Sequence, residues 1–262
     1  MKAIGTGVCC LLLLFAALPQ FAHAGLSDRL QGYWKFDGNG NDSSGYGRDL
    51  SVFGASYGSG IIGQALVMTG SGTTYAQRPV SDGLFDFSSG VFTIQAWVNY
   101  HALPAVPQVL LEKFSRQTGP GWTLNRLEDN RYQFYWNSNS LETPVQSIAT
   151  DMWYQVVVVH SASSLEIYLD GSSIASKSQV AQSASDNPLL VGRRSAEDPS
   201  GPFNVNGSLD EVAIWNRALT SQEISALWND GRGASAVPLP ASLLLFGPGL
   251  VGLAAIRKRF KK

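Results

Sequence analysis

The chain has 262 residues, of which 44% are hydrophobic and only 15% charged, and its formal net charge is −1. This value hides an asymmetry, because one basic residue is Lys2 and five others follow position 256, so that residues 25–236 carry 13 basic side chains against all 20 acidic ones, a charge of about −7. Such an acidic surface repels the phosphates of nucleic acid and excludes that class of partner, whereas cations and uncharged sugars remain compatible.

The first 24 residues have the features of a secretory signal peptide. Lys2 precedes an apolar run over 8–18, and Ala22-His-Ala24 is a small-x-small cleavage site. The run is too short for a membrane anchor. Cys9 and Cys10 lie within it, so the exported chain would have no disulfide and would depend on its core, a bound metal or both.

Short segments rich in β-forming residues follow, separated by turns of Gly, Asp and Ser. In chain order they cover 30–36, 50–52, 64–69, 73–78, 92–100, 108–114, 121–126, 131–137, 153–160, 165–170, 172–177, 189–193 and 209–215. Asp170-Gly171 predicts a type I′ hairpin turn, because both central positions of that turn need a positive φ. The pattern predicts an all-β, two-sheet antiparallel sandwich that forms one domain over 25–230.

One helix is expected after the last strand. Thr220 and Glu223 have the spacing of a capping box, in which each side chain bonds the backbone N–H of the other residue. Ile224, Leu227 and Trp228 then fall on one narrow apolar face. The sandwich should therefore carry a single short C-terminal helix.

A family resemblance rests on the segment 207–224, whose sequence is Gly-Ser-Leu-Asp-Glu-Val-Ala-Ile-Trp-Asn-Arg-Ala-Leu-Thr-Ser-Gln-Glu-Ile. It resembles the closing signature of LamG-like (concanavalin A-like lectin/glucanase) jelly-roll domains. Matching stretches occur in the order that this family uses, at 32–37, 42–45, 92–98, 153–158 and 167–171. The resemblance covers about 26–228 and implies a jelly-roll sandwich, a fold that hosts many unrelated activities.

Residues after 230 differ in composition from the domain. Gly231-Arg-Gly-Ala-Ser-Ala236 predicts a flexible linker, and Val237-Pro-Leu-Pro240, an apolar span over 241–256 and a basic end follow it. As a helix this span measures about 24 Å, a marginal transmembrane length, and its basic end should stay cytoplasmic. The segment 237–262 resembles the PEP-CTERM sorting signal, with Val-Pro-Leu-Pro in place of the usual Val-Pro-Glu-Pro. That resemblance implies transient anchoring in the inner membrane, recognition by an exosortase and removal of the tail; a plain tail anchor is the alternative.

The loop after the first strand is dense in oxygen donors. Asp37, Asn39, Asn41 and Asp42 lie within six residues, and Ca²⁺ prefers such ligands. The first and last strands of a jelly roll lie together, which would bring Asp210 beside this loop, and the LamG-like resemblance also implies a structural calcium near such an aspartate. We predict a calcium site made by Asp37, Asn39, Asp42 and Asp210. The alternative is that the loop residues only bond their own backbone.

Catalysis has little support in the sequence. Glucanases on this fold resemble one another in a Glu-x-Asp-x-(x)-Glu strand motif, which this chain lacks, and retaining glycosidases need two carboxyl groups about 5–5.5 Å apart. The nearest pair is Glu166 and Asp170, but Asp170 belongs to the predicted hairpin turn. The sequence also has no nucleophile elbow, P-loop or Rossmann glycine pattern. We predict no catalytic residue.

Sugar binding would require exposed aromatic rings, since the C–H face of a sugar packs against a ring. Tyr135, Trp136 and Trp122 are the candidates, and the alternative is that they serve the core of a large sandwich. We therefore expect an exported, non-catalytic module that binds carbohydrate or another extracellular matrix component, at the cell envelope or in exopolysaccharide. A purely structural matrix or adhesion protein is the second interpretation. A polysaccharide-cleaving enzyme is the third, if carboxylates from separate strands converge in a groove.

Overall fold

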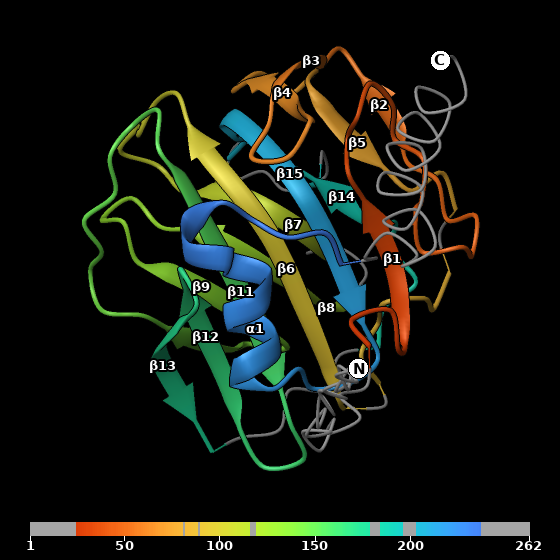
Figure 1. Ribbon diagram of the computed structural model, residues 1–262, viewed down its shortest axis with the longest axis vertical. Helices are drawn as coiled ribbons and strands as arrows, with labels where there is room; N and C mark the ends of the chain where they lie inside the picture. Colours follow the sequence, from red (N-terminus) through yellow and green to blue (C-terminus); the bar gives the residue numbers. More distant parts are fainter. Residues whose placement is uncertain are drawn as a thin grey trace, which may run out of the picture.

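The computed structural model describes residues 25–80, 82–88, 90–115, 119–178, 184–195 and 203–236. The expected signal peptide, 1–24, and the expected sorting signal, 237–262, lie outside the described residues. The described chain forms two antiparallel β-sheets, packed face to face, and one short α-helix (Figure 1). The predicted two-sheet sandwich with a C-terminal helix is confirmed.

The larger sheet lies in front in Figure 1 and has eight strands. In spatial order these are β13 (Ser172–Lys177), β12 (Leu165–Leu169), β11 (Trp153–His160), β6 (Phe92–Tyr100), β15 (Asn206–Trp215), β4 (Gln64–Thr69) and β3 (Ser56–Ser59), with β1 (Leu30–Trp34) also paired to β15. The smaller sheet lies behind it and has seven strands: β10 (Asn139–Glu142), β9 (Tyr132–Trp136), β8 (Gly119–Arg126), β7 (Gln108–Ser115), β14 (Leu190–Val191), β5 (Tyr75–Gln77) and β2 (Ser51–Phe53).

Strand β15 organises the larger sheet, because it pairs with β1, β4 and β6. The first and last strands of the described residues are therefore neighbours, as the sequence predicted. Its pairing with β6 is interrupted by a bulge after Asp210, where Glu211 has φ +49°. A bulge adds one residue to a strand and redirects the side chains next to it.

The main hydrophobic core fills the space between the two sheets. Strand β6 contributes alternate residues to it, Phe92, Ile94, Ala96 and Val98 among them, in agreement with the predicted period of two. At the turn between β12 and β13, Asp170 has φ +49° and Gly171 has φ +76°, which confirms the backbone conformation expected of a type I′ hairpin.

Two strands were not predicted from the sequence, β3 and β10. Their sequences, Ser-Tyr-Gly-Ser and Asn-Ser-Leu-Glu, are poor in β-branched residues and give no clear alternation. Both lie at a sheet edge, where each pairs with a single neighbour. Pairing with β4 and β9, rather than local preference, accounts for their extended backbone.

The helix α1 (Ser221–Trp228) covers the outer face of the larger sheet (Figure 1). Both halves of the predicted capping box between Thr220 and Glu223 are present, and the helix ends at Asn229 in the left-handed conformation, ahead of a 3₁₀ turn (Asn229–Gly231). Ile224 and Leu227 are buried in a second hydrophobic cluster with residues of β11, β12 and β15. The apolar face of α1, which repeats every 3.6 residues, thus packs on the outward side chains of the strands, which repeat every two residues.

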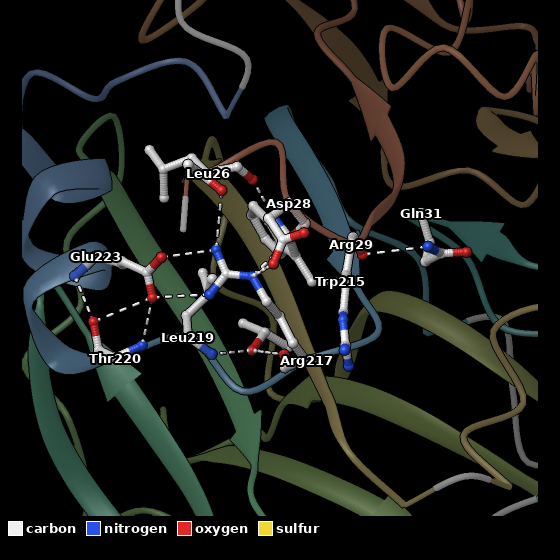
Figure 2. Close-up of polar contacts among 11 residues, drawn as sticks. Leu26, Asp28, Arg29, Gln31, Trp215, Arg217, Leu219, Thr220 and Glu223 are labelled. Atoms are coloured by element: carbon white, nitrogen blue, oxygen red, sulfur yellow. Dashed lines mark hydrogen bonds and ion pairs between the residues drawn. The ribbon is translucent and has the colours of Figure 1, made fainter. Parts of the chain in front are cut away.

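Arg217 connects this helix to the first residues of the domain (Figure 2). Its guanidinium donates two hydrogen bonds to the carboxylate of Glu223, at 2.9 and 2.7 Å, and others to the carbonyl oxygens of Asp28 and Gly25. Trp215 Nε1 donates to the carbonyl of Leu26 at 2.6 Å. The start of the domain is therefore fastened to the end of β15 and to α1.

Residues 231–236, which we expected to form a flexible linker, pack against the domain. Backbone hydrogen bonds return from Gly233 to Trp228 and from Ala234 to Leu227, at 3.1 and 2.9 Å. Ser235 Oγ lies 2.9 Å from Tyr33 Oη, and Ala236 is buried. The segment continues the cover that α1 places over the larger sheet.

Candidate functional site

The outer face of the smaller sheet lies on the side of the molecule away from α1 (Figure 1). Because residues in register across a sheet share one face, the strand register identifies the row that points outward here. That row contains Ser140, Tyr135, Thr123, Glu112, Leu190, Gln77 and Ser51. Its immediate neighbours along the strands, among them Phe134 and Leu124, belong to the core.

A first cavity of about 270 Å³ opens on this face over β7, β8 and β9. It is lined by Pro107, Val109, Phe114, Thr123, Asn125, Leu127, Gln133, Tyr135 and Arg194. The rings of Phe114 and Tyr135 meet edge to face, with centroids 5.6 Å apart. The cavity therefore combines one aromatic corner with amide and hydroxyl side chains, a lining that suits a polar ligand with apolar patches.

A second cavity of about 230 Å³ lies on the other side of Phe114, over β5 and β14. It is lined by Tyr75, Gln77, Phe114, Asn187, Pro188, Leu190, Arg193 and Ser195. Tyr75 stacks on the half-exposed ring of Phe53, with centroids 4.8 Å apart, and the guanidinium carbon of Arg193 lies 4.4 Å from the centre of the Tyr75 ring. Phe114 lines both cavities, so the two adjoin.

Four aromatic side chains of this face, Tyr135, Phe114, Tyr75 and Phe53, line or border the two cavities; we name them the aromatic row. The row is staggered, because the register places Phe114 and Tyr75 two positions to opposite sides of the level of Glu112 and Gln77. Its four side chains come from β9, β7, β5 and β2, and the strand order places β9 and β2 five spacings apart. At about 4.8 Å per spacing the row extends over roughly 24 Å. This is long enough for a short oligosaccharide.

Glu112 is a buried carboxylate between the two cavities. Its side chain is fully buried, accepts a 2.6 Å hydrogen bond from the backbone N–H of Ser195, and has Arg194 Nε at 3.8 Å. A buried charge is tolerated when it is paired in this way. Glu112 and Arg194 therefore form a fixed, compensated pair in the floor of the face.

The three residues predicted for sugar contact are divided by the structure. Tyr135 lies on the outer face and lines the first cavity, whereas Trp122 is 0% and Trp136 is 2% exposed. Trp122 donates to the carbonyl of Phe85 and stacks on Phe87, with ring centroids 5.0 Å apart. The expectation that the two tryptophans are exposed is wrong, because strand alternation turns both toward the core.

The predicted calcium ligands are also divided. Asp37 and Asp210, 173 positions apart, both contact the loop 60–64: Asp37 Oδ1 accepts from the backbone N–H of Gln64 at 2.7 Å, and Asp210 Oδ2 accepts from that of Ile62 at 3.2 Å. A Cβ on Gly63 would collide with Asp37, and one on Gly60 would collide with Asp210. The loop backbone is thus pressed against both carboxylates.

Asp42 and Asn39 take part in local turns. The carboxylate of Asp42 accepts four hydrogen bonds at 2.7–3.0 Å, from the backbone of Tyr33 and Arg48 and from the backbone and hydroxyl of Ser44. Asn39 accepts from the backbone of Asn41. These bonds are those of turn-forming residues, the alternative that the sequence left open.

Asp210 and Glu211 are adjacent buried carboxyl groups on β15, and burial disfavours the charged form of both. Burial raises the pKa of Asp210 to about 8, although backbone hydrogen bonds oppose the shift, and burial raises the pKa of Glu211 to about 7. Tyr33 donates its hydroxyl hydrogen to Glu211. Within the described residues, no group of three or more His, Cys, Asp or Glu side chains is arranged to hold a metal ion. A calcium ion at the loop would therefore need backbone carbonyl oxygens among its ligands.

The carboxylates considered for catalysis lie elsewhere. Glu166 accepts hydrogen bonds from the hydroxyls of Tyr168 and Ser173, and Asp170 accepts one from the backbone N–H of Gln155. Both belong to the larger sheet or its hairpin, and neither lines a cavity described above. The pair therefore serves the packing of β11, β12 and β13.

Sequence reasoning did not single out Phe114, Tyr75, Arg193 or Arg194. A bulge between Val109 and Leu111 interrupts the alternation along β7, so a strict period of two did not predict that Phe114 lies on the outer face. The arginines follow β14, a strand of only two residues. The sequence did carry one signal, the uncommon Arg-Arg pair in a domain of net negative charge.

In the described part of the chain no helix is both long and apolar enough to span a bilayer, and the apolar span 241–256 lies outside that part.

Comparison with solved structures identifies the fold. The binding domain of Paraclostridial Mosquitocidal Protein 1 matches with a TM-score of 0.64 at 19% identity, over 79% of this chain and 53% of that one. Domain 4 of AbnA, a GH43 extracellular arabinanase from Geobacillus stearothermophilus solved with arabinotriose, matches with a TM-score of 0.61 at 20% identity, over 76% and 97%. Trypanosoma rangeli sialidase matches with a TM-score of 0.61 at 20% identity, over 79% and 34%. The chain thus spans about half of the first of these structures and a third of the last.

Among curated proteins none matches the sequence significantly. The family described as the concanavalin A-like lectin/glucanases superfamily matches residues 70–225, which is more than half of the chain. This range runs from the end of β4 into α1 and includes the aromatic row except Phe53. The chain belongs to the concanavalin A-like lectin/glucanases superfamily.

Proposed function

We propose that this chain is an exported, non-catalytic module that binds a glycan on the outer face of its smaller sheet. The observation that carries the proposal is the aromatic row along two adjoining cavities lined by amide and hydroxyl side chains. Ring faces accept the C–H faces of sugars, while Asn125, Gln133 and Gln77 offer donors and acceptors to hydroxyl groups. The complex of arabinanase Domain 4 with arabinotriose supports a sugar ligand on this fold.

The cavity linings favour binding over hydrolysis. Glycoside hydrolysis in most families uses two carboxyl groups that flank the scissile bond. Among the described residues that line the two cavities there is no aspartate or glutamate. Glu112 lies beneath the face, but it is fully buried and paired with Arg194. Among these described lining residues, a bound glycan would therefore meet no acid and nucleophile pair.

Calcium is proposed as a structural ion at the loop 60–64. Asp37 and Asp210 are the candidate ligands, because their carboxylates contact the same loop, where each of them accepts a single hydrogen bond from the loop backbone. Asp210 also accepts one from the backbone N–H of Glu211. Asp42 fits less well, since four hydrogen bonds already use its oxygens. The bound ion would supply positive charge that lets Asp210 remain ionised, and so would fasten β15 to the loop.

Export and sorting remain part of the proposal. The segment 1–24 would direct secretion, and 237–262 would act as a PEP-CTERM signal that an exosortase recognises at the inner membrane. Removal of this tail would deliver the domain to the cell envelope or to an extracellular polysaccharide matrix. The features that support this route are the small-x-small site before residue 25 and the proline motif, apolar span and basic end of the tail.

The test is binding of the purified protein to the extracellular polysaccharide of its own source and to a glycan array. We expect binding that Tyr135→Ala and Phe114→Ala each weaken on the order of tenfold, as truncation of a binding hot spot does. Tyr46→Ala is the matched control, because Tyr46 is an aromatic residue, 58% exposed, on a loop outside the aromatic row.

Two results would count against the proposal. A folded protein that binds no glycan would favour the alternative of a purely structural matrix or adhesion protein. Glycan binding that Tyr135→Ala and Tyr46→Ala weaken equally would mean that the site lies on another face.

A further inference from the structure

We infer that the site on the smaller sheet selects anionic saccharides and that Arg193 binds their negative group. This inference rests on the proposed glycan site and specifies its ligand class. It starts from the charges around the two cavities. Each cavity is lined by one arginine, Arg194 in the first and Arg193 in the second, and among their described lining residues there is no carboxylate.

This lining contrasts with the rest of the domain. Residues 25–236 carry 13 basic against 20 acidic side chains, so that the average surface repels an anion. The second cavity, lined by Arg193 and by no carboxylate among its described residues, is an exception on such a surface. An anionic ligand would therefore be directed to it, and a neutral one would gain nothing from the charge.

The two arginines have different roles. Arg194 lies 3.8 Å from the buried carboxylate of Glu112, and its guanidinium carbon is 5.1 Å from the ring centre of Phe203. Because Glu112 compensates its charge, we assign Arg194 a structural role, in which the pair holds the lining of the first cavity in place. Arg193, in contrast, forms no ion pair with any carboxylate in the described part of the chain.

The position of Arg193 suits recognition of an anion beside a sugar ring. Its Nε donates to the carbonyl of Arg194 at 3.0 Å, and its guanidinium lies on the Tyr75 ring, so that packing limits the freedom of the side chain. The terminal N–H groups of a guanidinium form a planar fork that matches a carboxylate or a sulfate. Phe53 and Arg193 cover the two faces of the Tyr75 ring, so the ring open to a sugar in this cavity is that of Phe114. A sugar bound in the second cavity, which Phe114 and Arg193 both line, would place an acidic substituent within reach of this fork.

The ligand class is therefore a saccharide that carries carboxylate groups, as hexuronic acids do, or sulfate groups. Both anions match the same fork, and the probes below distinguish them. The test uses the purified protein and titrates it with polygalacturonate oligomers, with the same oligomers after reduction of their carboxyl groups, and with dextran sulfate beside unmodified dextran.

We expect the wild-type protein to bind the acidic form of one pair on the order of tenfold more tightly than its neutral partner, since charge-assisted hydrogen bonds are the stronger ones. Arg193→Gln should remove this preference, because the affinity for the acidic form should fall to about that for the neutral form. Arg193→Lys keeps the charge without the fork and should retain part of the preference. Arg232→Gln is the matched control, because it removes the same charge from an exposed site next to α1, 72% exposed as a side chain.

The outcomes separate this inference from the proposed function. Equal affinity for acidic and neutral forms, or a preference that survives Arg193→Gln, would overturn the inference and leave the glycan site in place. If Arg232→Gln also lost the preference for acidic saccharides, the preference would come from the net charge of the protein, and this too would overturn the inference. A protein with an unchanged melting curve that binds none of these saccharides, and no glycan in the array, would overturn both.

Discussion

Replacement of Arg217 by glutamine tests how the cover over the larger sheet is held in place. The side chain is 12% exposed and bonds both carboxylate oxygens of Glu223, itself 7% exposed, together with two carbonyl oxygens near residue 25 (Figure 2). The substitution would leave the buried carboxylate of Glu223 with Thr220 as its remaining partner. It would also release the start of the domain from α1.

The magnitude follows from burial and pairing. Removal of one partner from a buried ion pair costs about 3–5 kcal/mol. The cost here should lie at the lower end of this range, because two hydrogen bonds from Thr220 still stabilise the carboxylate of Glu223. We therefore expect a loss of about 3 kcal/mol in the free energy of unfolding. For a domain of this size that corresponds to a fall of about 6–12 °C in Tm.

The pH dependence has a definite sign. Burial alone would raise the pKa of Glu223, but hydrogen bonds from Arg217 and from Thr220 outweigh it and hold this pKa below its usual value. The folded state thus binds the proton less readily than the unfolded state, so the stabilisation is present above the unfolded pKa of about 4.3 and is lost as pH falls through the lower folded value. The difference in free energy of unfolding between wild type and Arg217→Gln should therefore become smaller below about pH 4.

The assay is thermal and urea unfolding of wild type, Arg217→Gln, Glu223→Gln and the double variant. Because the two side chains contact each other, their separate losses should exceed the loss in the double variant by about 1 kcal/mol or more. Additive losses would refute the reasoning. So would a pH-independent gap, because it would trace the loss to packing rather than to the charge of Glu223.

Three further predictions concern the helix, the ion and the tail. Leu227→Ala should destabilise the domain by about 2–5 kcal/mol and Thr220→Ala by about 1 kcal/mol, since the first empties a buried site and the second removes one cap; the reverse order in melts would mean that α1 is not docked. Calcium in hundredfold excess over its Kd should raise the free energy of unfolding by about 2.7 kcal/mol, and Asp210→Asn should abolish this gain. Asp42→Asn should lower the Tm by the same amount in calcium and in chelator. Coincident wild-type melts with and without calcium would remove the proposed ion. Deletion of 241–262 should release the domain from the membrane fraction, and unchanged fractionation would contradict the sorting proposal.

The sequence predicted the architecture well because its strands and helix carry strong local signals. The alternation in β6, the Asp170-Gly171 turn and the Thr220–Glu223 capping box each define a backbone conformation within a few residues. The edge strands β3 and β10 escaped prediction, since their extended conformation comes from a neighbouring strand. Residues 231–236 escaped it too, because small residues give no sign that Ala236 will be buried.

The candidate site was harder to predict, for a different reason. Aromatic residues suit both a core and a binding face. The face that each one occupies depends on its position in the alternation of the strand, so Tyr135 points outward while Trp122 and Trp136 point inward. The bulge between Val109 and Leu111 shifts the pleat of β7 by one residue ahead of Phe114, and no feature of the composition marks it. Arg193 and Tyr75 come from distant segments, so their contact required the fold.

The two outer faces of the sandwich differ in a way that bears on where a ligand can bind. On the larger sheet, α1, the residues that follow it and the first residues of the domain enclose a second hydrophobic cluster, fastened by Arg217. The aromatic row on the smaller sheet has no such enclosed cluster beneath a covering element within the described residues, and its rings remain partly exposed. Exposed apolar surface that is grouped and bordered by polar groups marks a site of interaction. Within the described residues, α1 thus covers the larger sheet, whereas the aromatic row on the smaller sheet keeps rings that are partly exposed, which is the physical reason to look for the glycan there.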